Sequence, residues 1–269
     1  MEGGADEKVF GSIARGGFIG VLGGVLCHNE EGSHQNDDDI RNATTHRQTP
    51  ATKGHADATA TWNYVALGDS LAAGVDVRRG YVERYAAHIE SDTGARVEVL
   101  NLGVSGQTSS ELLYALRNDE SMRRALSTAE VVTFNIGIND LGHAGEAYES
   151  GVCDGGDGQE CLRAAVEKLE KNWEAIVAEL LCLRSPEDTI IRTTGLGYTP
   201  RVAAIFEPYV AEVNRHIATT TAFYGIPYAQ TSLDERDMSP DGVHPNGAGY
   251  EVIAHRLREL GYDPLISPR

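Results

Sequence analysis

Basic residues and long apolar runs are both scarce in this chain of 269 residues. It has 23 Lys and Arg against 40 Asp and Glu, which gives a formal net charge of −17. Binding to nucleic acid regardless of sequence depends on Lys and Arg that neutralise phosphates, so no nucleic-acid partner is expected. No stretch reaches the roughly 20 consecutive apolar residues that a membrane-spanning helix needs. Neutral or cationic molecules are the easier partners, although a solubility or high-salt adaptation explains the acidic excess at least as well.

Cysteine is scarce too, with four residues in the whole chain. No Cys-x-x-Cys and no paired Cys and His spacing is present, so the sequence predicts no metal site. Cys153 and Cys161 bracket the flexible loop Asp-Gly-Gly-Asp-Gly-Gln-Glu, which can close as a disulfide in an oxidising compartment. Two unpaired cysteines beside a loop are the alternative.

The first 60 residues differ from the rest of the chain. Residues 16–27 form a short apolar run whose length suits a signal peptide better than a membrane span, and Cys27 at its end would carry lipid in a lipoprotein. Residues 28–60 contain almost no large apolar side chains, which is typical of a disordered linker. We therefore expect a signal or anchor segment and linker over residues 1–60 and a folded domain over residues 61–269. Export is the predicted location, with the cytoplasm as the alternative.

Short apolar segments alternate with helical patterns from Trp62 onward. Strands are predicted at residues 64–67, 97–102, 131–136, 189–193 and 226–229, and helices near residues 81–91, 110–116, 162–180, 208–224 and 247–260. Strands separated by helices at this spacing predict an α/β fold, with a parallel sheet of about five strands covered on both faces.

Polar residues and glycines follow three of the predicted strands. Parallel strands place their carboxyl ends along one edge of a sheet, so Ser70, Gly103 and Asn139 are expected to converge there. A turn-rich loop with Asp241 and His244 precedes the last helix. Acyl transfer requires a serine, a base, a group that orients the base, and hydrogen-bond donors for the oxyanion, and these loops supply all of them.

Each of these residues has a predicted role. Ser70 would be the nucleophile, His244 the base and Asp241 the group that orients the imidazole. The N–H groups of Ser70 and Gly103 and the side-chain amide of Asn139 would donate to the oxyanion. Taken alone, Ser70 would be explained as well by a helix N-cap, so the prediction depends on the whole set.

Taken in order, these blocks resemble those of the SGNH hydrolases, also called the GDSL esterase and lipase family: Gly68-Asp69-Ser70-Leu71, Gly103, Gly137-x-Asn139-Asp140 and Asp241-x-x-His244-Pro245. The resemblance covers the chain from about Trp62 to the carboxyl terminus. It implies a three-layer, flavodoxin-like sandwich and hydrolysis of carboxylic esters without a metal or an organic cofactor, with the roles given above. The ordinary α/β-hydrolases are less similar, because their Gly-x-Ser-x-Gly elbow is broken here by Ala72.

The substrate remains open at this stage. The resemblance allows lipases, short-chain esterases, thioesterases and carbohydrate deacetylases, and residues 141–159 and 195–205 are expected to form the walls of the acyl pocket. We expect a monomer that acts on a small-molecule or lipid ester and contacts a membrane only through an amino-terminal anchor. The alternative is a non-catalytic module of the same fold, tethered through Cys27, that binds glycan or lipid.

Overall fold

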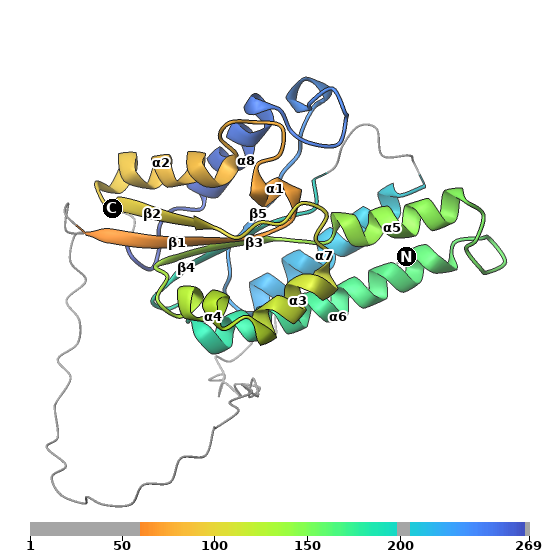
Figure 1. The fold of residues 1–269 in the computed structure, drawn as a ribbon, viewed down its shortest axis with the longest axis horizontal. Coiled ribbons are helices and arrows are strands. Elements are labelled where there is room, and N and C mark those ends of the chain that lie inside the picture. The colour runs from red at the N-terminus through yellow and green to blue at the C-terminus, as the bar shows by residue number, and fades with distance from the viewer. Residues whose placement is uncertain (1–59, 198–204, 267–269) are drawn as a thin grey trace, which may run out of the picture.

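A five-stranded parallel sheet forms the centre of the protein (Figure 1). The structure, a computed structural model, describes residues 60–197 and 205–266. The predicted apolar run, the predicted linker and Cys27 lie outside the described residues, as does most of the predicted pocket wall at residues 195–205. The strands are β1 (Thr61–Gly68), β2 (Arg96–Asn101), β3 (Val131–Asn135), β4 (Ile190–Thr194) and β5 (Tyr228–Ala229).

The strands lie in the order β2-β1-β3-β4-β5. Val65 of β1 pairs with Leu100 of β2 on one side and with Val132 of β3 on the other. This is the flavodoxin-like order, in which the chain changes direction across the sheet between β1 and β3. Ligands of such sheets bind outside the carboxyl ends of the strands at that point. Ser70 follows β1 and Asn139 follows β3, so both residues lie at the edge of the sheet where a ligand is expected.

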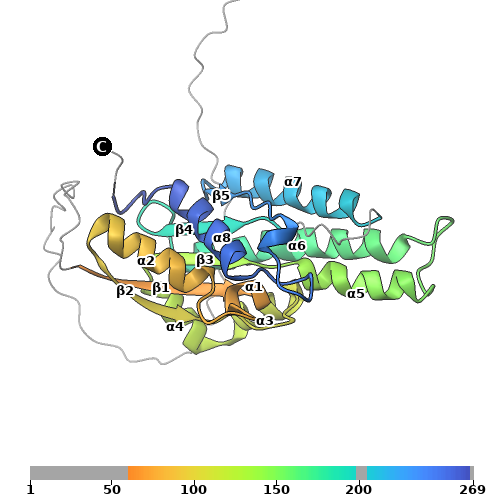
Figure 2. The ribbon, with the colours of Figure 1, turned by 90° about the horizontal axis from the view of Figure 1, so that it is seen from above.

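Helices cover both faces of the sheet (Figures 1 and 2). On one face, α2 (Tyr81–Thr93) and α8 (Gly247–Glu259) bury a core with the even-numbered residues of β1, such as Tyr64 and Ala66. On the other, α3 (Ser109–Asn118), α4 (Glu120–Ser127), α6 (Glu160–Leu183) and α7 (Glu207–Phe223) pack on Val65 and Leu67. A strand points alternate side chains to opposite faces, so β1 is apolar on both. The three-layer α/β sandwich is confirmed.

Trp173 of α6 is the largest side chain buried in the second core. Its ring centroid lies 4.9 Å from that of Phe134 on β3, and its indole N–H donates to the carbonyl oxygen of Ile136 at 3.3 Å. The bond satisfies the one polar group that burial of a tryptophan would otherwise leave without a partner. Trp173 thereby fixes the end of β3, from which the chain continues into the site.

Three α-helices of the described chain were not predicted from the sequence: α1 (Ser70–Ala73), α4 and α5 (Ile138–Glu149). The last of them begins where the Gly137-Ile138-Asn139-Asp140 block indicated a loop. Gly137 adopts φ 131°, a conformation that suits glycine, and turns the chain from β3 directly into the helix. The carboxylate of Asp140 then accepts bonds from the N–H and hydroxyl of Ser109, at 2.8 and 2.6 Å, and joins the start of α5 to α3.

The loop between α5 and α6 holds the predicted cysteine pair. Cys153 and Cys161 lie at disulfide distance, with their Cα atoms 5.2 Å apart. In both views α5 and the first half of α6 run side by side and project beyond the sheet, with this loop at their tip (Figures 1 and 2). In the part of the chain that the structure describes, no helix combines the length and the apolar character needed to cross a membrane.

Candidate active site

Ser70 begins a short helix, α1 (Ser70–Ala73), directly after β1. Gly68 makes the turn with φ 139°, and a Cβ atom at that position would collide with the carbonyl oxygen of Asn135. Oδ1 of Asp69 caps the helix by accepting the N–H of Leu71 at 2.9 Å. The N–H of Ser70 is the first of the helix and has no acceptor within it. The turn therefore presents a hydroxyl and a backbone N–H together at the edge of the sheet.

A buried chain of hydrogen bonds supports this turn from below. The hydroxyl of Tyr81 donates to Oδ1 of Asn135 at 2.9 Å, and the amide of Asn135 donates to Oδ1 of Asp69 at 3.0 Å. Asp69 is 1% exposed, and burial raises the pKa of its carboxyl to about 6 although the bonds from Leu71 and Asn135 lower it. Asp69 thus holds the turn that carries Ser70. The sequence did not single out Asn135 or Tyr81, although a polar residue at the end of an apolar strand was a signal for the former.

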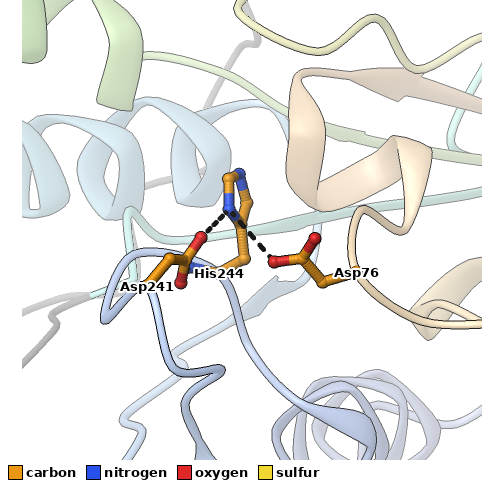
Figure 3. A group of neighbouring side chains, drawn as sticks. All are labelled: Asp76, Asp241 and His244. Carbon is orange, nitrogen blue, oxygen red and sulfur yellow. Dashed lines mark hydrogen bonds and ion pairs between the residues drawn. The ribbon is translucent and has the colours of Figure 1, made fainter.

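Asp241 and His244 lie in the loop before α8 and contact each other (Figure 3). Nδ1 of His244 is 2.6 Å from Oδ2 of Asp241, while Oδ1 of Asp241 accepts the N–H groups of Val243 and His244 at 2.9 and 3.0 Å. The bonds from the Val243 N–H, the His244 ring and the His244 N–H lower the pKa of Asp241 to about 2. A carboxylate that binds Nδ1 orients the ring and leaves Nε2 to act on another group. In Figure 3, Nε2 points away from the carboxylate.

Asn139 lies in the first turn of α5. Its side-chain amide donates to the carbonyl oxygen of Gln107 at 2.9 Å, which fixes the direction of the amide and ties α5 to the loop after β2. An amide held by a backbone carbonyl keeps a second N–H that can donate elsewhere. Asn139 lines a cavity together with Ser70 and His244.

Gly103 packs against the backbone of α1. Its N–H donates to Oδ1 of Asn101 at 3.0 Å, and a Cβ atom there would lie 2.8 Å from the carbonyl carbon of Ala72. Gly103 is therefore a glycine because the backbone after β2 passes close to α1. Gly106, three residues later and at φ 80°, lines the cavity that contains Ser70 and Asn139. Gly106 stands in the same loop as Gly103, and the sequence did not single it out.

Two cavities meet at Ser70 and His244. One of about 260 Å³ has mostly apolar walls, formed by Leu71, Ile138, Leu196, Leu233, Met238, Val243 and Ile253. The other, of about 530 Å³, lies along α5 and is lined by Asn139, Gly142, Gly145, Glu146, Glu149 and Phe206. Ser70, Ile138, Val243 and His244 belong to both. A reacting group at Ser70 can therefore extend in two directions.

One cluster of carboxylate and imidazole groups stands out among residues 60–197 and 205–266. Oxygens of Asp76 and Asp241 and a ring nitrogen of His244 all lie within 4.8 Å of one another. Nδ1 of His244 is already bonded to Asp241. That ring nitrogen is therefore not free to bind a metal ion, and we assign no metal to the cluster.

Comparison with known proteins identifies the family. The model of the GDSL-like Lipase/Acylhydrolase family matches residues 66–252, which include Ser70, Asn139, Asp241 and His244. The chain belongs to this family. It is a carboxylic ester hydrolase of the GDSL or SGNH type, as its sequence motifs predict.

Two relatives of this GDSL hydrolase illustrate the match. The chain is 28% identical over 216 residues to the spore germination lipase LipC of Bacillus licheniformis, covering 76% of this chain and 99% of that protein. It is 27% identical to the crystal structure of the lipase Lip_vut3 from a goat rumen metagenome, with a TM-score of 0.68 and coverage of 76% and 99%.

A second similar structure is more distant. The acetylxylan esterase Axe2 of Geobacillus stearothermophilus is 18% identical to this GDSL hydrolase, with a TM-score of 0.57 and coverage of 79% of this chain and 99% of that one. At that level of identity the likeness supports the fold and nothing finer.

Proposed function

We propose that this GDSL hydrolase cleaves carboxylic esters through an acyl-enzyme formed on Ser70. The observation that carries the proposal is the bond between Nδ1 of His244 and Asp241, on a histidine that shares both cavities with Ser70. The described structure has no hydrogen bond between Ser70 and His244. Such bonds are often long before substrate is bound, so its absence does not count against the pair.

The two half-reactions use the same groups. In the first, Nε2 of His244 takes the proton of the Ser70 hydroxyl as the oxygen attacks the ester carbonyl, and returns it to the leaving alcohol. In the second, His244 removes a proton from water, which attacks the acyl-enzyme and releases the acid. Asp241 keeps Nδ1 protonated and stabilises the imidazolium in both steps. No metal or organic cofactor is needed for this route.

The oxyanion donors are the N–H of Ser70, the amide of Asn139 and a backbone N–H after β2. We assign the last role to Gly106 rather than to Gly103, because Gly106 lines the cavity with Ser70 and the Gly103 N–H is already bonded to Asn101. Reaction of Ser70 with a phosphonate places a negative oxygen in this position. The amide resonance of Gly106 should then shift strongly in a ¹⁵N–¹H spectrum. A comparable shift at Gly103 with none at Gly106 would reverse the assignment.

The cavities suggest an ester with at least one apolar part. The smaller cavity is lined mainly by aliphatic side chains, and an apolar pocket beside a few polar groups is typical of small-molecule sites. A rate series over nitrophenyl esters of increasing acyl length separates short-chain esterase activity from lipase activity. The absence of hydrolysis at every length would favour the non-catalytic module instead.

Single substitutions test the catalytic roles. Ser70→Ala should abolish ester hydrolysis, and His244→Ala should reduce it by at least about a thousandfold. The far-UV circular dichroism spectrum of both variants should match that of the wild type. Near-normal turnover by either variant would refute the corresponding role.

We also propose that the protein is exported and that its hydrolase domain begins near residue 61. The Cys153 and Cys161 pair supports export, because disulfides persist in oxidising compartments. The first strand, which begins at Thr61, supports the boundary. Measuring the intact mass of the mature protein would locate its first residue and show whether Cys27 carries lipid.

A further inference from the structure

A second carboxylate, that of Asp76, faces His244 from another part of the chain (Figure 3). Asp241 stands three residues before His244 in the same loop, whereas Asp76 follows α1. Oδ2 of Asp76 lies 3.9 Å from Nδ1 of His244, the nitrogen that Asp241 holds at 2.6 Å. Figure 3 shows the two carboxylates on either side of this nitrogen. The histidine therefore has two negative neighbours rather than one.

The backbone places Asp76 there by contacts of its own. Asp76 has φ 66° and is the one residue other than glycine with a positive φ in the described chain. The loop that carries Asp76 brings Gly74 and Gly80 into close contact, since a Cβ atom on Gly80 would lie 2.8 Å from the Cα atom of Gly74. The hydroxyl of Tyr250 on α8 donates to the Val75 carbonyl oxygen at 3.1 Å. Asp76 is thus held relative to the helix that follows His244.

We propose that Asp76 is a positioning residue whose charge stabilises the imidazolium form of His244 during both proton transfers. The proposal rests on the proposed function, in which His244 becomes positively charged as Ser70 attacks. A carboxylate at 3.9 Å attracts that charge directly. The side chain of Asp76 is 47% exposed, so water weakens the attraction, and we expect a roughly three- to tenfold effect on the rate.

Among residues 60–197 and 205–266, three carboxyl groups face His244. Asp241 belongs to its own loop, Asp76 comes from the loop after α1, and Asp69 interacts with it from beneath Ser70. Tyr250 lies near the same groups: burial raises the pKa of its hydroxyl, and Asp69, Asp76 and Asp241 raise it further. A test of Asp76 must therefore separate its charge from that of Asp69, which titrates near pH 6.

Asp76→Asn in the full chain is the matched substitution. Asparagine has the size of aspartate and tolerates the same positive φ, so the variant removes the charge and keeps the turn. Its kcat/KM for 4-nitrophenyl butyrate is measured across pH. We expect a plateau three- to tenfold lower, and an acidic limb displaced to lower pH by about half to one unit, because the imidazolium is less stable without Asp76. Added salt should reduce the difference in kcat/KM between the wild type and Asp76→Asn.

Two further variants make the result decisive. The first is the double variant Asp69→Asn, Asp76→Asn, which is compared with Asp69→Asn alone, where residue 69 does not titrate. Its acidic limb should be displaced to lower pH by the same amount. Asp76→Gly, which also accepts the positive φ, should displace the limb in the same direction. A lower plateau with an unmoved acidic limb, or an unchanged profile, would overturn the proposal and leave Asp76 as a turn residue. Hydrolysis that survives Ser70→Ala would instead refute the proposed function.

Discussion

Asp69→Asn should change how the stability of this GDSL hydrolase depends on pH. Burial raises the pKa of Asp69 from its ordinary value of 3.8 to about 6. The folded protein therefore holds this proton more tightly than the unfolded chain does. The resulting stabilisation is complete below about pH 4 and is lost as the pH rises to about 6. A difference of roughly two pKa units at about 1.36 kcal/mol each amounts to about 3 kcal/mol.

The asparagine variant isolates this effect. Its side-chain oxygen can still accept the N–H of Leu71 and the amide of Asn135, while its amide group does not titrate in this range. Urea unfolding of both proteins, followed by the fluorescence of the buried Trp62 and Trp173, gives their free energies of unfolding from pH 4 to pH 7.5.

The difference between the two proteins carries the test, because the other carboxyl groups contribute equally to both. The free energy of wild-type unfolding minus that of Asp69→Asn should fall by about 2 kcal/mol between pH 4 and pH 6.5, because part of the full change takes place outside this range. A constant difference, or one that rises with pH, would show that Asp69 is not the buried carboxyl described here.

Three other substitutions have expected outcomes. Asn139→Ala should lower kcat by about a hundred- to a thousandfold with little change in KM, since in the proposed mechanism its amide donates to an oxyanion present only in the transition state; an equal rise in KM would argue for ground-state binding. Tyr81→Phe should lower the free energy of unfolding by about 1 to 3 kcal/mol, because it leaves Oδ1 of Asn135 buried without its donor; unchanged urea midpoints would contradict this. Replacing Cys153 and Cys161 by serine should cost about 2 to 3 kcal/mol of stability for so short a loop, and the difference from the wild type should vanish when both proteins are unfolded under reducing conditions.

The fold was predictable because its strands are short apolar segments that are easily recognised in the sequence. The apolar segments around Val65, Val132 and Ile191 are each followed by a helix, which leaves a parallel sheet as the natural solution. α5 was missed because Gly137, Gly142 and Gly145 gave its sequence the composition of a loop. In the folded chain Gly145 accommodates the ring of Phe206, so this glycine serves packing.

The candidate site was predictable to the extent that its chemistry lies at strand ends. Ser70 and Asn139 follow from that rule, whereas the Asp241 and His244 pair was predicted from the turn-rich loop before the last helix. Ser70, Asn139 and His244 line one cavity. The proposed assignment of Gly106 in place of Gly103 depends on which N–H is already bonded, and only coordinates show this. Asp76 is separated from His244 by more than half of the chain and reaches it through a positive φ, for which the sequence offers no pattern.

Covalent trapping of the nucleophile tests the central claim most directly. The full chain is treated with a fluorophosphonate, digested, and mapped by tandem mass spectrometry. The proposed function predicts one adduct, on the oxygen of Ser70, that is absent from Ser70→Ala and strongly slowed in His244→Ala. An adduct on another residue, or undiminished labelling of Ser70→Ala, would contradict the assignment of Ser70 as the nucleophile.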